Sequence, residues 1–136
     1  AQAEEGLNIK HDIAVPVSCI AAFVQTTDAL LQAAIPGIRL VNFGHLGDGN
    51  LHFNVQAPVG ADAAEFLRQH EEQVNTLVFD SVQRFRGSIS AEHGVGSLKR
   101  DKLAHYKSPV ALDLMRSIKR ALDPHNLMNP GRVISP

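Results

Sequence analysis

Two runs of alternating apolar and polar residues flank the dipeptide Asp48-Gly49, and this pattern constrains the fold more than any other. Such alternation predicts half-buried strands at residues 38–45 and 50–56. Asp-Gly between two such runs predicts a two-residue hairpin turn, because glycine tolerates the positive φ angle that this turn needs. We therefore expect an antiparallel sheet, with the apolar residues of the second strand pointing into a core.

Further periodic segments extend this hairpin into an α+β pattern. Period-2 apolarity predicts a first strand at residues 8–17. Helical periodicity predicts one long helix capped by Ser18 and stopped by Pro36-Gly37, and another from Asp62 to Gly87. Residues 88–91 are a candidate fourth strand. The resulting order β-α-β-β-α-β is that of a ferredoxin-like antiparallel sheet with both helices on one face.

Two more helices are predicted after the sheet, at residues 97–107 and 108–122. In the second of these, Ser108 is the expected N-cap and Pro109 takes the first helical position. The residues expected on its inward face are Leu112, Met115, Ile118 and Leu122. A chain of 136 residues is long enough to bury one core, so residues 1–136 are expected to form a single domain.

Charge and composition exclude several classes of function. The 13 Lys and Arg residues nearly balance 14 Asp and Glu, which offers no basic surface for nucleic acid or an anionic membrane. The most apolar stretch, residues 13–27, is short of a transmembrane segment and is broken by Pro16. The lone Cys19 excludes an internal disulfide and fits a reducing compartment. Without a signal-peptide pattern, a cytoplasmic location is expected, with a membrane-peripheral or mitochondrial-matrix one left open.

Histidine is the unusual residue of this composition, with seven in the chain. If Asp48 and Gly49 form the turn, His45 lies directly opposite His52, with Cβ atoms about 4.5–5.5 Å apart. Two imidazoles at that separation can share one metal ion. The alternative is a solvent-facing strand with two incidental histidines, and the hairpin pattern alone does not decide between them.

Candidates for a third metal ligand follow residues 88–91. There Glu92 and His93 precede Gly94 and Gly96, which permit a turn that would aim both side chains into one cavity. Two histidines and one carboxylate, with open positions for water or substrate, form a common catalytic set for zinc or iron. Taken by itself, this segment fits a glycine-rich connector with a polar tip better.

Other titratable residues have simpler interpretations. Lys10, in the cluster Lys10-His11-Asp12, is either a solvated strand end or an anchor for a substrate carboxylate. His70 lies on the apolar face of a helix and is expected to pack in the core. His105 and His125 are expected to be structural or solvated. Cys19 is expected to be packed against its neighbours and to have no catalytic role.

Three motifs, in this order, resemble the C-terminal domain of the FAD-linked oxidases. They are GHLGDGNLHFN at 44–54, SAEHGVG at 90–96 and LDPHNLMNPGRV at 122–133. The resemblance is to the branch of the vanillyl-alcohol-oxidase (PCMH) superfamily that contains D-lactate dehydrogenase, the glycolate oxidase flavin subunit and D-2-hydroxyglutarate dehydrogenase. KHDIAVPVS at 10–18 is similar to a strand of that family's substrate domain, so the resemblance covers nearly the whole chain.

The resemblance implies a metal site and a catalytic base. His45, His52 and Glu92 match the ligands of a divalent metal, with zinc expected first and iron or manganese as alternatives. His93 matches the base that removes the proton of the substrate hydroxyl. The implied reaction transfers the Cα hydride of a 2-hydroxy acid to the flavin while this histidine takes the proton.

The same resemblance implies contacts with substrate and cofactor. Lys10 and Asn54 match positions that contact the substrate carboxylate and its surroundings, and Asn129 matches a segment lying close to the flavin. Arg132 stands where many members have Lys, which keeps the charge and changes its geometry.

The motifs belong to one part of a larger enzyme in the family that they resemble. FAD would then be bound mainly by a separate FAD-binding domain, in the same polypeptide or in a partner chain. The implied substrate is a small 2-hydroxy acid of the D-lactate, glycolate or D-2-hydroxyglutarate type. We expect the chain alone to be inactive, and a homodimer is a further possible assembly.

Two other functions remain open on the sequence. A stand-alone hydrolase would use the two histidines and the glutamate to activate water, and would act without flavin. A non-catalytic ferredoxin-like interaction module would carry the histidines incidentally, and would bind no stoichiometric metal.

Overall fold

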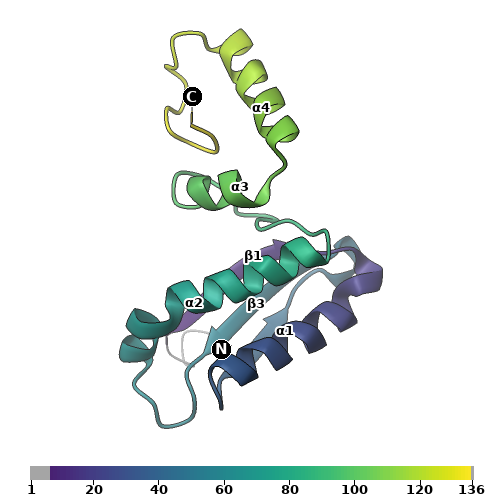
Figure 1. Cartoon of the computed structure of the whole chain (residues 1–136), viewed down its shortest axis with the longest axis vertical. Coiled ribbons are helices and arrows are strands. Elements are labelled where there is room, and N and C mark those ends of the chain that lie inside the picture. The colour runs from purple at the N-terminus through teal and green to yellow at the C-terminus, as the bar shows by residue number, and fades with distance from the viewer. Residues whose placement is uncertain (1–6, 136) are drawn as a thin grey trace. The chain divides into compact units, whose positions relative to one another are not determined.

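The structure, a computed structural model, describes residues 7–135 (Figure 1). These residues form two compact units, of which the first ends at Glu92 and the second begins at His93. The first unit holds the described strands and two long helices, and the second holds two shorter helices followed by an irregular C-terminal segment.

Three strands form the sheet of the first unit: β1 (Asn8–Ala14), β2 (Arg39–Phe43) and β3 (Asn50–Gln56). Their order in the sheet is β1-β3-β2, and both pairings are antiparallel. The predicted α+β class is therefore confirmed, and β3 has the bounds that its alternating pattern predicts.

Helices α1 (Ile20–Ala34) and α2 (Ala63–Arg84) cover one face of this sheet (Figure 1). The Phe23 ring of α1 meets the Phe53 ring of β3 edge to face, with centroids 5.5 Å apart. The largest apolar side chains of this core are fully buried: Ile13, Phe23, Leu31, Leu51, Phe53, Val55, Val74, Val78 and Val82.

The starts of the two helices follow different rules. Asp62 caps α2 as predicted, since its Oδ1 accepts hydrogen bonds from Ala64 N at 2.8 Å and Glu65 N at 3.0 Å. The cap predicted at Ser18 is wrong: a 3₁₀ turn, η2 (Val17–Cys19), precedes α1, and no side chain caps either element. The first strand also ends earlier than predicted, before Pro16, which has no N–H to continue the ladder.

The predicted fourth strand is reduced to one isolated bridge between Ala14 and Ser88. Their backbones exchange hydrogen bonds of 3.0 Å and 2.7 Å, which places this segment beside β1 in the order expected of a ferredoxin-like sheet. The ladder does not continue regularly to 91: Ser90 N turns to Ser88 Oγ, and Ala91 N lies near both the backbone oxygen and the side chain of Asp12. This bridge still fixes the position of the chain four residues before Glu92.

The second unit contains α3 (Arg100–Tyr106) and α4 (Pro109–Leu122). Ser108 caps α4 as predicted, accepting from Ala111 N at 3.2 Å. Leu112 is buried, but the prediction that Ile118 and Leu122 point inward is wrong, because they are 59% and 72% exposed. The described residues of this unit offer α4 too few neighbours to cover its whole apolar face.

One stretch passes a length and composition test for a membrane-spanning helix. Val17–Ala34 spans 18 residues with a mean hydropathy of 1.2. In the structure it is η2 followed by α1, and its residues Phe23 and Leu31 are completely buried in the core of the first unit. The same pattern is typical of a core helix in a folded domain, so it is weak support for a membrane span.

Candidate functional site

The face of the sheet opposite α1 and α2 carries polar side chains from two strands. Because Phe53 packs on α1, the alternation of β3 places His52 and Asn54 on the other face. In the register of β1 with β3, Asp12 lies opposite His52 and Lys10 lies opposite Asn54. Directly opposed residues share a face, so these four side chains are neighbours. The structure thus brings together Lys10 and Asn54, the two predicted substrate contacts.

The connection from β2 to β3 differs from the predicted two-residue turn. His52 pairs with Phe43 and not with His45, so the predicted opposition of the two histidines is wrong. The loop runs over residues 44–49, and the predicted register is displaced by two residues. His45 lies outside both strands.

Backbone angles in the loop explain this difference. A two-residue turn of type I′ needs positive φ at both central residues, but of Asp48 and Gly49 only Gly49 has one, at 75°. A 3₁₀ turn, η3 (Leu46–Asp48), forms instead. Asn50 N closes the loop with a hydrogen bond of 3.2 Å to His45 O. The side chain of His45 is left 74% exposed to solvent.

The carboxylate of Glu92 lies between the two histidines. Its Oε1 lies 3.1 Å from Nδ1 of His45, and its Oε2 lies 3.8 Å from Nε2 of His52. The three predicted ligands come from the loop after β2, from β3 and from the end of the first unit. Each histidine thus lies beside a different oxygen of Glu92, and the role of the three residues as metal ligands stays a prediction.

This donor set fits a divalent cation. On a tetrahedral zinc ion with bonds of about 2.0–2.1 Å, neighbouring donor atoms lie about 3.3 Å apart. In the described residues, the group whose ligand atoms all lie within 4.8 Å of one another is Asp12, His52 and Glu92, and Nδ1 of His45 lies 3.1 Å from the Glu92 oxygen Oε1. Two imidazoles and one carboxylate also match the ligand types that zinc and non-haem iron prefer. The Glu92 side chain is 44% exposed, which leaves the site accessible to an ion and a small substrate.

Neighbouring side chains restrict the movement of these donors. Asn50 is buried, and its Nδ2 donates a hydrogen bond to Oε1 of Glu92. The Phe43 ring stacks on the His52 ring, with centroids 4.9 Å apart and an interplanar angle of 26°. Sequence reasoning gave Asn50 and Phe43 no role, since Asn50 and Glu92 are distant in the chain and Phe43 meets His52 only in the observed register.

Asp12 is another residue of the site to which the sequence gave no role. It is 4% exposed, and its ligand atom lies within 4.8 Å of those of His52 and Glu92. The cluster Lys10-His11-Asp12 was the available signal. Its central residue points the other way, into the core, where Nδ1 of His11 donates to Phe53 O at 2.8 Å.

The remaining histidines behave in different ways. His93, the predicted base, follows Glu92 directly, begins the second unit and is exposed. Its role stays a prediction. His70 was predicted to pack in the core but is only half-buried. Its ring lies at the edge of the core, with its centroid 5.3 Å from that of Phe66. His105 and His125 are exposed, as predicted.

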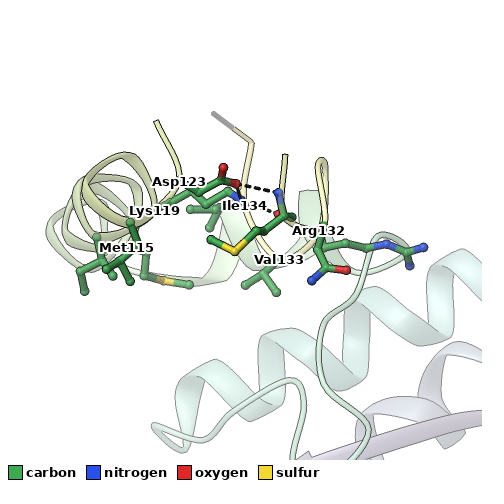
Figure 2. A pocket seen from close by; sticks show the side chains of 10 residues that line it. Met115, Lys119, Asp123, Arg132, Val133 and Ile134 are labelled. Atoms are coloured by element: carbon green, nitrogen blue, oxygen red, sulfur yellow. Dashed lines mark hydrogen bonds and ion pairs between the residues drawn. The ribbon is translucent and has the colours of Figure 1, made fainter. Parts of the chain in front are cut away.

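An apolar cavity of about 380 Å³ lies within the second unit (Figure 2). Asn129, the predicted neighbour of the flavin, and Arg132 contribute its polar edge. Arg132 Nη1 also donates to Ser97 Oγ at 3.2 Å. The apolar lining comes from α4 and the C-terminal segment: Met115, Ile118, Leu122, Met128, Val133 and Ile134.

Asp123 organises the turn that leads to Asn129. Its carboxylate accepts hydrogen bonds from Lys119 Nζ and from Met128 N at 2.9 Å (Figure 2). It also accepts one from Leu127 N at 2.9 Å. The hydrogen bond from Lys119 holds the pKa of the Asp123 carboxyl below its usual value, against the opposing effect of burial, and the two backbone N–H groups add to the lowering. The turn is therefore tied to α4 through one ionised side chain.

Comparison with a family model supports the resemblance of the motifs. The model described as "FAD linked oxidases, C-terminal domain" matches residues 1–133 of this chain. That range includes every residue predicted for the metal, the substrate and the flavin.

Curated proteins of known name are similar over most of this chain. A D-2-hydroxyglutarate dehydrogenase of Stutzerimonas stutzeri (strain A1501) is 44% identical over 126 residues, covering 93% of this chain and 27% of the relative. One from Xanthomonas citri pv. viticola is 47% identical over 124 residues, covering 91% and 26%. A putative mitochondrial D-lactate dehydrogenase of Schizosaccharomyces pombe is 34% identical over 133 residues, covering 92% and 24%. The chain spans about a quarter of the length of these relatives.

Proposed function

Since this chain belongs to the family of FAD-linked oxidase C-terminal domains, we propose that it is the substrate- and metal-binding domain of a flavin-dependent enzyme that oxidises a D-2-hydroxy acid. The observation that carries the proposal is the convergence of His45, His52 and Glu92 on the face of the sheet that also holds Lys10 and Asn54. Relatives named D-2-hydroxyglutarate dehydrogenase and D-lactate dehydrogenase suggest the substrate class.

His45, His52 and Glu92 would hold one divalent metal ion, with zinc as the first choice and iron or manganese as alternatives. When bound, such an ion acts as a Lewis acid that orients the substrate oxygens and lowers the pKa of the substrate hydroxyl. Asn50 holds one oxygen of Glu92 by a hydrogen bond, and Phe43 restricts the ring of His52. Both contacts reduce the reorganisation that metal binding requires.

Lys10 and Asn54 would bind the substrate carboxylate. They form the opposed pair two residues along the strands from Asp12 and His52, a spacing of about 7 Å. The ammonium group of Lys10 supplies a positive charge, and the Asn54 amide supplies a hydrogen-bond donor. The carboxylate end of a hydroxy acid would then lie beside this pair, with its hydroxyl toward the metal ligands.

His93 would act as the base for the substrate hydroxyl. Its neutral imidazole accepts the hydroxyl proton as the Cα hydride leaves, so the substrate loses two electrons and two hydrogens and becomes a 2-oxo acid. FAD, bound mainly by another part of the protein in cis or trans, supplies the hydride acceptor. Asn129 would lie near that flavin. The proposed location is cytoplasmic or membrane-peripheral, with the mitochondrial matrix as the alternative that a relative named mitochondrial suggests.

The test uses the complete flavoprotein that contains this chain, with turnover and metal content measured in parallel. We expect His93→Ala to keep its metal and lose about 10²–10⁴-fold in kcat, the usual contribution of a positioned base. His52→Ala should lose both metal and turnover. His105→Ala, an exposed histidine of the second unit, serves as the matched control and should change neither.

Three results would contradict parts of the proposal. Normal turnover in His93→Ala would remove that residue from the mechanism. A wild-type protein without stoichiometric metal would favour a non-catalytic interaction module. Metal-dependent hydrolysis by flavin-free protein would favour a hydrolase.

A further inference from the structure

Asp12 has contacts that a solvated strand-end carboxylate would lack. It lies in β1 directly opposite His52, on the same face of the sheet, and is 4% exposed. Burying an ionised carboxylate is unfavourable unless hydrogen bonds or charges compensate for the lost water. The hydrogen bonds that stabilise this buried carboxylate therefore indicate which part of the structure Asp12 holds in place.

Two backbone N–H groups of the segment that carries Glu92 donate hydrogen bonds to the Asp12 side chain. Its Oδ2 accepts from Glu92 N at 2.9 Å and from Ala91 N at 3.3 Å. Ala91 N also approaches the backbone oxygen of Asp12 at 3.2 Å. Main chain and side chain of one residue thus hold the same two-residue segment.

This tether matters because nothing regular holds Glu92. The segment after α2 makes one isolated bridge to β1, at Ser88, and Glu92 belongs to no helix or strand. The Glu92 side chain is nearly half exposed, yet both of its oxygens must face an imidazole. Fixing its backbone N–H relative to β1 fixes its Cα relative to His52, which is opposite Asp12 in the neighbouring strand.

We propose that Asp12 is a positioning residue for the metal ligand Glu92 and acts through these backbone hydrogen bonds. This inference rests on the proposed metal site. Direct ligation by Asp12 is the alternative that a test must exclude, since its ligand atom lies within 4.8 Å of those of His52 and Glu92. The two backbone N–H groups occupy Oδ2, so ligation would use the other carboxylate oxygen, Oδ1, and the substitutions below distinguish the two roles.

Two substitutions separate positioning from ligation. Asp12→Ala removes the acceptor, whereas Asp12→Asn keeps an amide oxygen that can accept both N–H groups but is a far poorer metal ligand. A positioning role predicts that Asp12→Ala weakens zinc binding about 10–100-fold, as for other residues that orient ligands, and that Asp12→Asn weakens it less than about threefold. Ligation predicts equal, large losses in both variants.

The control is Asp62→Ala in the same unit. Asp62 also accepts two backbone N–H groups through one carboxylate oxygen, but it caps α2. This variant loses the same kind of hydrogen bond, so it reports any effect of general destabilisation on zinc affinity. We expect its zinc Kd to match that of the wild type.

The measurement is a chelator-buffered zinc titration of the full protein, with the ¹H–¹⁵N resonance of Glu92 as a second readout. Under the proposal, Asp12→Ala shifts this resonance in the metal-free protein and Asp12→Asn shifts it much less. Wild-type zinc affinity in Asp12→Ala, or equal losses in both variants, would overturn the inference.

Two further outcomes keep the test decisive. If Asp12→Ala does not fold, Asp12→Ser retains one hydroxyl acceptor and should give an intermediate loss, while wild-type affinity in that variant would overturn the inference. If wild type binds no zinc, or His52→Ala binds it equally well, the proposed metal site itself fails. That result differs from failure of the role of Asp12 alone.

Discussion

The two units of this chain are stabilised in different ways. In the first, two helices and a sheet enclose fully buried side chains such as Phe23, Phe53 and Val78. In the second, Leu103 and Leu112 are the buried apolar residues among those described, and α4 leaves Ile118 and Leu122 exposed. The turn after α4 is held by hydrogen bonds to Asp123 instead of by a core.

This difference bears on where the proposed site lies. The residues proposed to hold the metal and the substrate carboxylate belong to the unit with its own core. Packing fixes the backbone of the strands that carry Lys10, His52 and Asn54, whereas His45 and Glu92 lie on loops that hydrogen bonds hold to the sheet. The second unit, which holds His93 and Asn129, buries few apolar side chains and depends more on polar contacts such as those of Asp123.

The largest predicted effect contrasts the apolar residues of the two units. Phe53→Ala should lower the free energy of unfolding by about 3–5 kcal/mol, because it leaves a cavity in a closed core. Leu122→Ala should change it by less than about 0.5 kcal/mol, because that side chain is 72% exposed. Urea unfolding measures both values. A loss above about 2 kcal/mol for Leu122→Ala would break the comparison by showing that another surface covers α4.

A smaller effect is expected at the helix caps. Asp62→Ala in the first unit and Ser108→Ala in the second each remove a side-chain acceptor for backbone N–H groups. Each should cost about 1 kcal/mol in local stability. Amide hydrogen exchange in the first turns of α2 and α4 would report the two losses separately. Global loss of protection from Ser108→Ala would indicate that the units unfold together.

The smallest effect concerns the pH dependence of the second unit. The pKa of Asp123 is lowered in the folded state, mainly by Lys119, so its ionised form stabilises the fold. That contribution is complete above the unfolded-state pKa of about 3.9 and disappears as pH falls through the lower folded-state pKa. Asp123→Asn should therefore be less stable than wild type at pH 7, and the difference should vanish in strong acid. A constant difference would contradict this assignment.

Sequence periodicity predicted most of the first unit because its core repeats regularly. Residues Leu51, Phe53 and Val55 alternate without interruption, and β3 has the predicted bounds. The loop before it was mispredicted, since Asp-Gly is compatible with both a two-residue turn and a longer loop in which only Gly49 takes positive φ. Local sequence does not distinguish these turns when tertiary contacts fix the ends.

The sequence predicted three residues that the structure places near one another, but not the residues that hold them there. His45, His52 and Glu92 were identified from the hairpin, the glycine-rich segment and the family resemblance, and the structure brings them together. Asp12 and Asn50 reach Glu92 across large sequence separations, and such contacts leave no periodic trace. The apolar periodicity of α4 likewise predicted that Ile118 and Leu122 are buried, but in the structure both side chains are exposed.

The central claim is that His45, His52 and Glu92 bind one divalent metal ion. Anomalous diffraction at the zinc edge from crystals of the zinc-loaded protein tests it most directly. The account predicts a single strong peak about 2.0–2.1 Å from Nδ1 of His45 and Nε2 of His52, with a Glu92 oxygen completing the protein ligands. A peak elsewhere, or none at these three side chains while zinc is bound stoichiometrically, would contradict it.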